Sequence, residues 1–277
     1  MKVQPQIVAL GGGGFSMEPE NPALDDYILR LTGKDRPRIC FVPTASGDAG
    51  LYINRFYEAF DESRARPAHL PLFERDNRNL RAFLLAQDVI YVGGGNVANL
   101  LEIWRRHGVD EILRECWEAG IILCGISAGM NCWFEGCSTD SFGPLAPLAD
   151  GLGFLPGSAC PHYDGEPERR PTFLRYVREG ALPNGYAADD GAALHFVGRE
   201  LNRVVGSRPG ARAYRIERGD GGEVTETPLP GDLLRASETS EPDESEFSEP
   251  FEERIRRAVA DDPIDFTIAP ENDDLRD

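Results

Sequence analysis

The sequence predicts an α/β fold built on a doubly wound, mostly parallel sheet. Short runs of apolar, often β-branched residues alternate with amphipathic stretches of helical length through the first two-thirds of the chain. This alternation is typical of buried parallel strands joined by crossover helices. Four of the apolar runs also end in small-residue turns, namely GGGG, PTASGD, GGGN and GISAG. Open parallel sheets bind their ligands at such carboxyl ends of strands.

Each element follows from its local pattern. Strands are expected at 6–10, 37–44, 88–92 and 121–126, with a weaker strand at 68–73. Helices are expected between them, at 21–31, 51–60 and 79–87 and over one long segment at 99–120. Successive strand–helix–strand units make right-handed crossovers, which places all the marked turns on one edge of the sheet. One glycine turn is ordinary, whereas four on a single edge indicate a site.

The pattern becomes less regular after Gly129. Residues 141–162 are expected to be mainly loop, although the segment GFLPGSA within them is strand-like. A helix is expected at 170–180, and residues 186–198 and 202–207 are expected to form a pair of strands. Residues 1–231 are therefore predicted to form a single α/β domain.

Charge is distributed unevenly along the chain. The sequence has 47 acidic and 29 basic residues and a net charge of -18. Of these, 16 acidic and 5 basic residues lie in 232–277, so the body carries only -7. Segment 232–277 is also poor in large apolar residues, which predicts an acidic, flexible tail. The overall charge would repel nucleic acids and anionic lipids, so neither is expected as a partner.

Targeting signals and metal motifs are not evident in the sequence. The apolar stretch near the start is too short for a signal peptide, and no run is long enough to span a bilayer. The six cysteines are scattered and lack CxxC spacing, and no HExxH occurs. We therefore expect reduced core cysteines, a cytoplasmic protein, no metal and no cofactor.

Residues 125–129, Gly-Ile-Ser-Ala-Gly, match the GxSxG pattern of a nucleophile elbow. In such an elbow a sharp strand-to-helix turn exposes the serine hydroxyl, and the start of the following helix favours an oxyanion. The pattern alone is a weak signal, because a glycine-rich junction can hold an incidental serine. Its position at the end of a buried strand favours Ser127 as a nucleophile.

A serine nucleophile needs a base, and the chain has four histidines. His69 and His195 lie in apparent strands and His107 lies at a helix end, where structural roles are ordinary. His162 lies in a loop after a strand-like run, which favours it as the base. The alternative is a loop histidine that contacts only solvent.

These motifs together resemble those of peptidase E, the aspartyl dipeptidase, and its relatives, including cyanophycinase. The resemblance covers roughly residues 5–200 and is carried by GGGN at 93–96, GISAGMNCWFE at 125–135 with the TDSFG that follows, PHY at 161–163 and ADDGAA at 188–193. It implies a three-layer, flavodoxin-like sandwich similar to the class I glutamine amidotransferases, with a serine where those enzymes carry cysteine.

The resemblance also implies roles for particular residues. Ser127 would be the nucleophile and His162 the general base, with Asp190 or Asp140 as the carboxylate that orients the histidine. The N–H groups of Ala128 and Gly94 would form the oxyanion hole. Asn96 and Arg170 would bind substrate, and a guanidinium at Arg170 would suit the carboxylate of an N-terminal aspartate.

The function expected from these features is hydrolysis of short peptides through an acyl-enzyme on Ser127. The peptides would include dipeptides with N-terminal Asp, and the protein would be a monomer or homodimer. Two alternatives remain open: another amide hydrolase of the cyanophycinase kind, and a non-catalytic member that only binds a ligand.

Overall fold

A computed structural model describes residues 4–234 of the chain. The predicted acidic tail, apart from its first three residues, lies outside the described residues. Asp232–Leu233, which the charge pattern assigned to that tail, form the short strand β14 and pair with β11. The main sheet therefore extends slightly beyond the predicted end of the body.

The main sheet has eight strands in the order β14-β11-β10-β1-β5-β4-β2-β3. The five strands from β1 to β3 in that order run parallel, which confirms the predicted sheet. Their bounds, with those of the three remaining strands, are as follows: β1 (Gln6–Leu10), β2 (Arg38–Val42), β3 (Arg66–His69), β4 (Val89–Val92), β5 (Ile122–Ile126), β10 (Ala192–Val197), β11 (Glu200–Gly206) and β14 (Asp232–Leu233).

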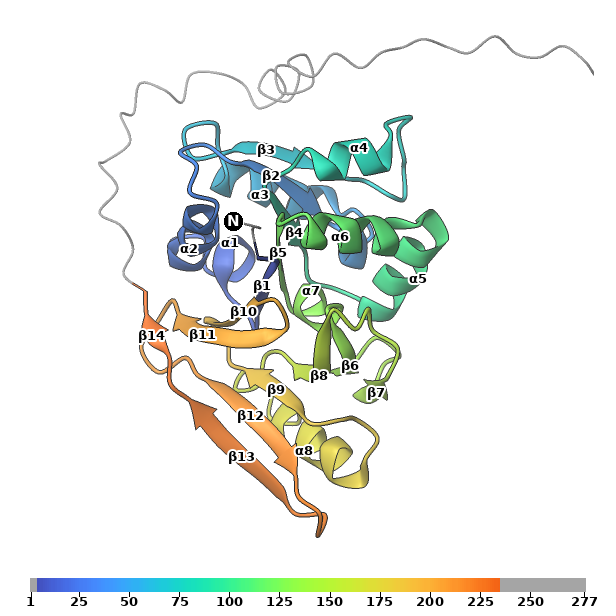
Figure 1. Cartoon of the computed structure of the whole chain (residues 1–277), viewed down its shortest axis with the longest axis vertical. Helices are drawn as coiled ribbons and strands as arrows, with labels where there is room; N and C mark the ends of the chain where they lie inside the picture. The colour runs from blue at the N-terminus through green and yellow to red at the C-terminus, as the bar shows by residue number, and fades with distance from the viewer. Residues whose placement is uncertain (1–3, 235–277) are drawn as a thin grey trace, which may run out of the picture. The chain divides into compact units, whose positions relative to one another are not determined.

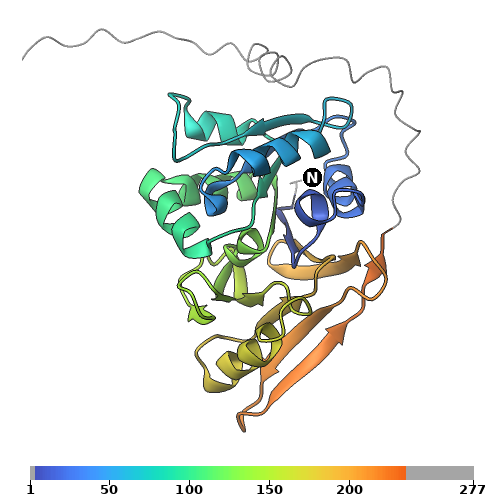
Figure 2. The ribbon, with the colours of Figure 1, turned by 180° about the vertical axis from the view of Figure 1, so that it is seen from behind.

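Helices cover both faces of this sheet (Figures 1 and 2). Alternate residues of each parallel strand point to opposite sides, so Ile7 of β1 packs with one group of helices and Val8 with the other. One face carries α4 (Leu80–Leu85), α5 (Val97–His107) and α6 (Val109–Glu118). The other carries α1 (Gly14–Met17), α2 (Ala23–Leu31) and α3 (Gly50–Ala59). Because both faces are covered, the central strands β4 and β5 are buried at every position rather than at every second one, whereas the edge strand β3 is only partly buried.

The long helix predicted at 99–120 is in fact two helices, α5 and α6. Gly108 separates them with a φ of +68°, a left-handed conformation that ends α5. The helical periodicity continues on both sides of this break, which is why the sequence pattern concealed it. At its other end α5 begins after Asn96, whose side chain accepts the N–H of Asn99 at 2.8 Å.

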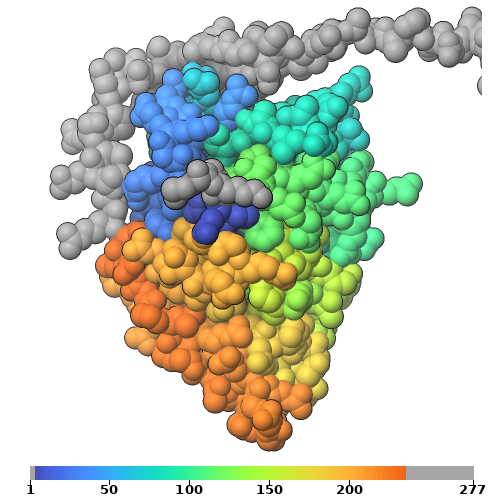
Figure 3. Space-filling model, in the orientation of Figure 1, coloured from blue at the N-terminus to red at the C-terminus, as the bar shows by residue number. Residues whose placement is uncertain are grey.

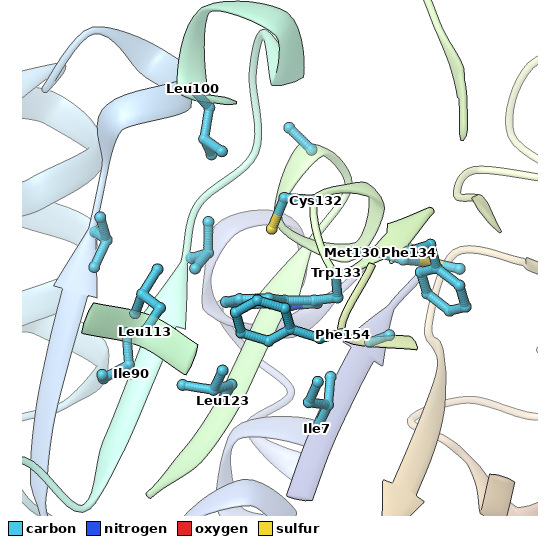
Figure 4. Packing of buried hydrophobic residues seen from close by; sticks show 14 of the residues in the cluster. Ile7, Ile90, Leu100, Leu113, Leu123, Met130, Cys132, Trp133, Phe134 and Phe154 are labelled. Carbon is cyan, nitrogen blue, oxygen red and sulfur yellow. The ribbon is translucent and has the colours of Figure 1, made fainter. Parts of the chain in front are cut away.

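Aromatic side chains fill the space between the main sheet and the elements that follow β5. Trp133 and Phe154 pack with their ring centroids 5.6 Å apart and contact the same cluster as Leu123 and Ile7 of the sheet (Figure 4). All six cysteines are buried and unpaired, as the sequence predicts. This cluster fixes the chain immediately after the GxSxG segment.

A second sheet of six strands was not predicted. Its order is β13-β12-β9-β8-β6-β7, and α8 (Arg169–Glu179) packs against it. Its strands are β6 (Phe134–Thr139), β7 (Ala146–Leu148), β8 (Leu155–Cys160), β9 (Gly185–Ala188), β12 (Ala213–Arg218) and β13 (Val224–Leu229). The stretch 141–162 is mainly loop, as expected, and its strand-like segment forms β8, whereas β7 was not predicted. β7 is only three residues long and contains Pro147, and β6 has an irregular register with β8, so neither β6 nor β7 has a clear strand pattern.

The segment from 185 to 206 connects the two sheets. The strand expected at 186–198 is in fact two strands, β9 in the second sheet and β10 in the main sheet. β10 pairs with β11 as predicted, in antiparallel orientation, and also runs antiparallel to β1 at the centre of the main sheet. The surface view shows the dark-blue start of the chain directly beside this orange segment (Figure 3). The turn before β10 therefore lies next to the glycine loop after β1, where an isolated bridge joins Gly12 to Asp190. In the part of the chain that the structure describes, no helix is long and apolar enough to cross a membrane.

Candidate active site

Ser127 lies at the sharp turn between β5 and α7 (Ala128–Asn131). Its φ of 58° and ψ of -111° are strained for a residue with a side chain. The flanking glycines permit the turn: a Cβ on Gly125 would lie 2.4 Å from the Gly129 carbonyl oxygen, and one on Gly129 would lie 2.3 Å from that of Val92. The segment is thus a nucleophile elbow in geometry as well as in sequence.

The helix that follows Ser127 is only one turn long. The sequence predicts that the dipole of this helix favours an oxyanion, but a four-residue helix has little such dipole. What the turn provides instead is the N–H of Ala128. As the first residue of a helix, Ala128 has an N–H with no intrahelical acceptor.

His162 and Asp190 form the second part of the site. His162 Nδ1 lies 2.6 Å from Asp190 Oδ1, and both side chains are largely buried. This contact leaves the Nε2 atom of His162 for any partner in the pocket. The backbone of His162 also has a positive φ, 52°, and its N–H donates to the Gly11 carbonyl at 3.1 Å.

The glycine loop after β1 holds this pair in place. A Cβ on Gly12 would lie 2.0 Å from Asp190 Oδ1 and 3.1 Å from His162 Nδ1. The Asp190 N–H donates to Asp164 Oδ1 at 2.8 Å, and the Arg208 guanidinium donates to the Asp190 carbonyl. The first marked turn therefore supports the histidine and its carboxylate rather than a phosphate or other ligand.

One pocket, of about 290 Å³, brings the two parts together. Ser127 and His162 both line it. The other lining residues come from α1, from α3, from the turn after β4 and from the end of β5: Ser16, Met17, Tyr52, Arg55, Gly94 and Ile126. Within residues 4–234 Ser127 Oγ and His162 are not directly hydrogen-bonded, and such bonds are often longer before substrate binds. A nucleophile, a base and a base-orienting carboxylate are the groups that acyl transfer requires.

Gly94 lies directly beside Ser127. A Cβ on Gly94 would be 3.3 Å from Ser127 Cβ and 3.8 Å from Ser127 Oγ. Its N–H, which the sequence predicts as an oxyanion donor, donates to the hydroxyl of Tyr52 at 3.2 Å. The predicted donor is thus at the right place but already has an acceptor.

Asp140, the alternative partner of the histidine, lies elsewhere. Its carboxylate is 58% exposed and lies 3.5 Å from the Arg169 guanidinium. Arg169 is buried and also bonds Glu166. The structure brings Asp190 and not Asp140 to His162, because the glycine loop after β1 positions the turn before β10.

The two predicted substrate-binding residues, Asn96 and Arg170, are engaged in other contacts. Both ends of the Asn96 amide are used, since Oδ1 caps α5 and Nδ2 donates to the Ser141 carbonyl at 2.9 Å. The Arg170 guanidinium pairs with Glu226 and lies 5.5 Å from the ring centroids of Tyr163 and Tyr214. Neither residue lines the pocket, so the geometry does not support these two assignments.

The other histidines have structural surroundings. His195 is buried between Tyr27 and Gln6, and burial lowers its pKa to about 4. His69 Nδ1 lies 2.8 Å from the Tyr57 hydroxyl, and burial lowers its pKa as well. His107 is the last residue of α5. These positions agree with the roles that the sequence predicted for them.

Sequence reasoning missed the contribution of α3 to the site. Tyr52 and Arg55 lie one turn apart on this helix, and both line the pocket with Ser127. Arg55 is exposed and, within residues 4–234, forms no salt bridge. The signal was present, because α3 directly follows one of the four marked strand ends. The sequence predicts only a helix at 51–60 and assigns none of its residues to the site.

A buried carboxylate lies beneath the pocket. Asp25 is 1% exposed, and burial raises its pKa to about 7 despite the opposing effect of Arg64. Its Oδ1 atom and the Tyr91 hydroxyl both lie close to Gly14, at the start of α1. Since α1 carries Ser16 and Met17 of the pocket wall, this acid lies under part of the site.

The chain is similar to several known peptidases. The chain is 55% identical over 225 residues to the uncharacterized peptidase YgaJ of Bacillus subtilis, covering 81% of this chain and 97% of that protein. It is 31% identical over 217 residues to peptidase E of Haemophilus influenzae, covering 72% and 91%. A crystal structure of a peptidase from an acI-B1 Actinobacterium has the same fold, with a TM-score of 0.62 at 19% identity, covering 83% of this chain and 96% of that one.

The match to a family extends over most of the body. Residues 7–204 match peptidase family S51, a span that begins in β1 and includes the elbow, the histidine turn and β10. Ser127, His162 and Asp190 all fall within it. On this evidence the chain is a member of peptidase family S51.

Proposed function

We propose that this chain is a serine-type peptidase that hydrolyses short peptides through an acyl-enzyme on Ser127. The observation that carries the proposal is the single pocket that holds both Ser127, on its strained elbow, and His162, with Nδ1 bound by Asp190. A strained residue at a strand end, facing a histidine fixed by a carboxylate, is the arrangement expected of an activated serine.

The reaction follows from this arrangement. Ser127 Oγ attacks the peptide carbonyl carbon while its proton passes to His162 Nε2, and the carbonyl π electrons move to the oxygen. When the tetrahedral intermediate collapses, the C–N bond breaks and His162 returns the proton to the leaving amine. Water then repeats the sequence on the ester. Asp190 keeps the proton of His162 on Nδ1 and stabilises the imidazolium.

The oxyanion forms on the Gly94 side of the elbow. The Ala128 N–H is one donor, as an unpaired first-turn amide. The second donor comes from the region of Gly94, whose backbone lies against Ser127. Loss of one such donor typically reduces the rate about 100- to 1,000-fold.

The substrates proposed are short peptides, including dipeptides with N-terminal Asp. A pocket of about 290 Å³ accommodates a small ligand rather than a folded protein. Arg55 is the cation at this pocket, and it replaces Arg170 as the group that would bind a substrate carboxylate. A cytoplasmic location and a monomeric or homodimeric state stay predictions from the sequence.

A fluorophosphonate probe tests the serine mechanism. We expect covalent labelling of the wild-type protein at Ser127 and none of Ser127→Ala, with both proteins folded by circular dichroism. Wild-type protein that is folded but not labelled would argue for a ligand-binding function instead. A panel of Asp-Xaa, Glu-Xaa and neutral dipeptides then tests the substrate. If Ser127 is labelled but no dipeptide is cleaved, another amide hydrolase activity of the same site is favoured.

A further inference from the structure

The hydroxyl of Tyr52 occupies an unusual position at the proposed oxyanion site. It accepts the N–H of Gly94 at 3.2 Å, and Gly94 lies directly beside Ser127. Tyr52 is on α3, after β2, whereas Gly94 follows β4, so the contact depends on the adjacent pairing of these strands. A side-chain hydroxyl therefore lies between the predicted backbone donor and the pocket.

The tyrosine ring is held firmly in this position. Its centroid lies 5.5 Å from that of Phe15 and 4.9 Å from that of Phe41, both of which are buried. The ring thus packs in the core while its hydroxyl reaches the pocket that Ser127 and His162 line. A preorganised donor of this kind is what electrostatic catalysis requires.

The hydrogen of the Tyr52 hydroxyl is available to another acceptor. In the bond with Gly94 the N–H supplies the hydrogen, so the hydroxyl uses a lone pair there and its own hydrogen points elsewhere. Burial raises the pKa of Tyr52 and outweighs the opposing effect of the hydrogen bonds that its oxygen receives from the Ser16 side chain and the Gly94 N–H. The hydroxyl therefore keeps its hydrogen at neutral pH and serves as a donor. Donation by Gly94 also polarises the O–H bond and strengthens it as a donor.

We propose that Tyr52 is a catalytic residue whose O–H donates a hydrogen bond to the oxyanion formed on attack by Ser127. The Ala128 N–H is the other donor, and Gly94 acts through Tyr52 rather than directly. No proton is transferred in this step, because the hydrogen stays on Tyr52 as charge develops and disperses. This inference rests on the proposed serine mechanism, and it assigns the second donor of that mechanism to a side chain.

A blocking role for Tyr52, in which its hydroxyl only occupies the Gly94 N–H, predicts the opposite change in rate. If the Tyr52 oxygen merely covers Gly94 N–H, substrate has to displace it, and removing the hydroxyl would speed the reaction. Tyr52→Phe distinguishes the two roles by the direction of its effect. The ring and its packing remain in this variant, so the aromatic cluster with Phe15 and Phe41 is preserved.

Tyr57→Phe is the matched control. Tyr57 is on the same helix, and its hydroxyl bonds His69 Nδ1 at 2.8 Å, away from the pocket lining. Both variants delete one tyrosine hydroxyl from α3, but only one of these hydroxyls faces Ser127. A general effect of the substitution on the helix would therefore appear in both.

The experiment measures the second-order rate at which a fluorophosphonate labels Ser127, because the phosphonyl oxygen develops the same charge as the oxyanion. We expect Tyr52→Phe to be about 10- to 1,000-fold slower than wild type, and Tyr57→Phe to be within about twofold. For any dipeptide that is cleaved, the loss should appear in kcat with little change in KM. Circular dichroism confirms that each variant is folded.

The possible results separate the two proposals. An unchanged or faster rate in Tyr52→Phe, with Ser127 labelled normally in wild type, overturns the role of Tyr52 and leaves the serine mechanism intact. An equal loss in Tyr52→Phe and Tyr57→Phe also overturns it, because the effect would then belong to the helix. If folded wild-type protein is not labelled at Ser127, both proposals are overturned.

Discussion

His162 Nδ1 and Asp190 Oδ1 lie 2.6 Å apart, although the two residues are 28 positions apart in the sequence. A third segment joins them, because the glycine loop after β1 accepts the His162 N–H at Gly11 and bridges Asp190 at Gly12. Any role for the histidine as a base therefore depends on three separate parts of the chain. Four predictions follow from this and from the other contacts of the site.

The carboxylate partner of His162 can be identified by paired substitutions. Asp190→Asn is expected to lower kcat/KM about 100- to 10,000-fold, because the amide no longer stabilises the imidazolium or fixes its tautomer. Asp140→Asn, which affects only an exposed contact with Arg169, should stay within about threefold. The measurement is kcat/KM for a cleaved dipeptide, together with the rate of fluorophosphonate labelling. An Asp140→Asn loss as large as that of Asp190→Asn would contradict the assignment.

Gly12 should tolerate no side chain. In Gly12→Ala the new methyl group would lie 2.0 Å from Asp190 Oδ1, so the carboxylate or the loop has to move. A displacement of about 1 Å can reduce the rate about 100-fold. Gly50→Ala is the control, since its Cβ would meet nothing within 4 Å. The prediction fails if folded Gly12→Ala retains wild-type kcat/KM.

Arg55 should determine any preference for acidic substrates. We expect Arg55→Ala to lower kcat/KM for Asp-Xaa dipeptides about 10- to 100-fold, the value of a charge-assisted hydrogen bond, with little effect on neutral dipeptides. Arg170→Ala removes the ion pair with Glu226 and should leave the ratio of Asp-Xaa to neutral rates unchanged. The same ratio in wild type and Arg55→Ala would show that Arg55 does not recognise the carboxylate.

Asp25 should make the protein less stable as the pH rises. Its pKa is about 7 in the folded protein, raised by burial from the ordinary 3.8, so folding keeps it protonated. Between these two values the unfolded chain loses this proton while the folded protein retains it, and stability falls with pH by at most about 4 kcal/mol. Below pH 3.8 the effect is absent, and above about 7 it is complete.

Asp25→Asn removes this titration and tests the prediction. Melting temperatures of the wild type and the variant at pH 5 and pH 8 provide the comparison. The variant should gain stability relative to the wild type on going from pH 5 to pH 8, because only the wild type then has to ionise a buried acid. Parallel melting curves at the two pH values would show that Asp25 does not titrate in this range.

Much of the fold follows from local sequence. β1, β2, β4 and β5 are buried on both faces, so each is a continuous apolar run that the sequence displays directly. β7 escaped prediction because it is a three-residue strand that contains a proline. The break at Gly108 was concealed because α5 and α6 keep helical spacing on either side of it.

The residues of the site also fall into two groups, those that the local sequence predicts and those that it does not. Ser127 was predictable because an elbow requires a local pattern of small residues around one serine, and His162 because it follows a strand within a loop. The choice between Asp190 and Asp140 was not, since both are ordinary loop carboxylates in the sequence. The resemblance pointed to Arg170, which follows His162 along the chain, whereas Arg55 reaches the pocket because the order of strands places α3 beside it.

The sequence by itself determined the class of sheet, the edge at which chemistry occurs and the residue at the elbow, because these depend on neighbours in the chain. Only the tertiary structure decided which carboxylate meets His162, which arginine lines the pocket and which hydroxyl bonds Gly94. Each of these contacts joins segments that are distant in sequence, and hydrogen bonds form only within about 3 Å. Strand order and loop packing set such distances, and neither can be inferred from the local sequence around the residues that make the contact.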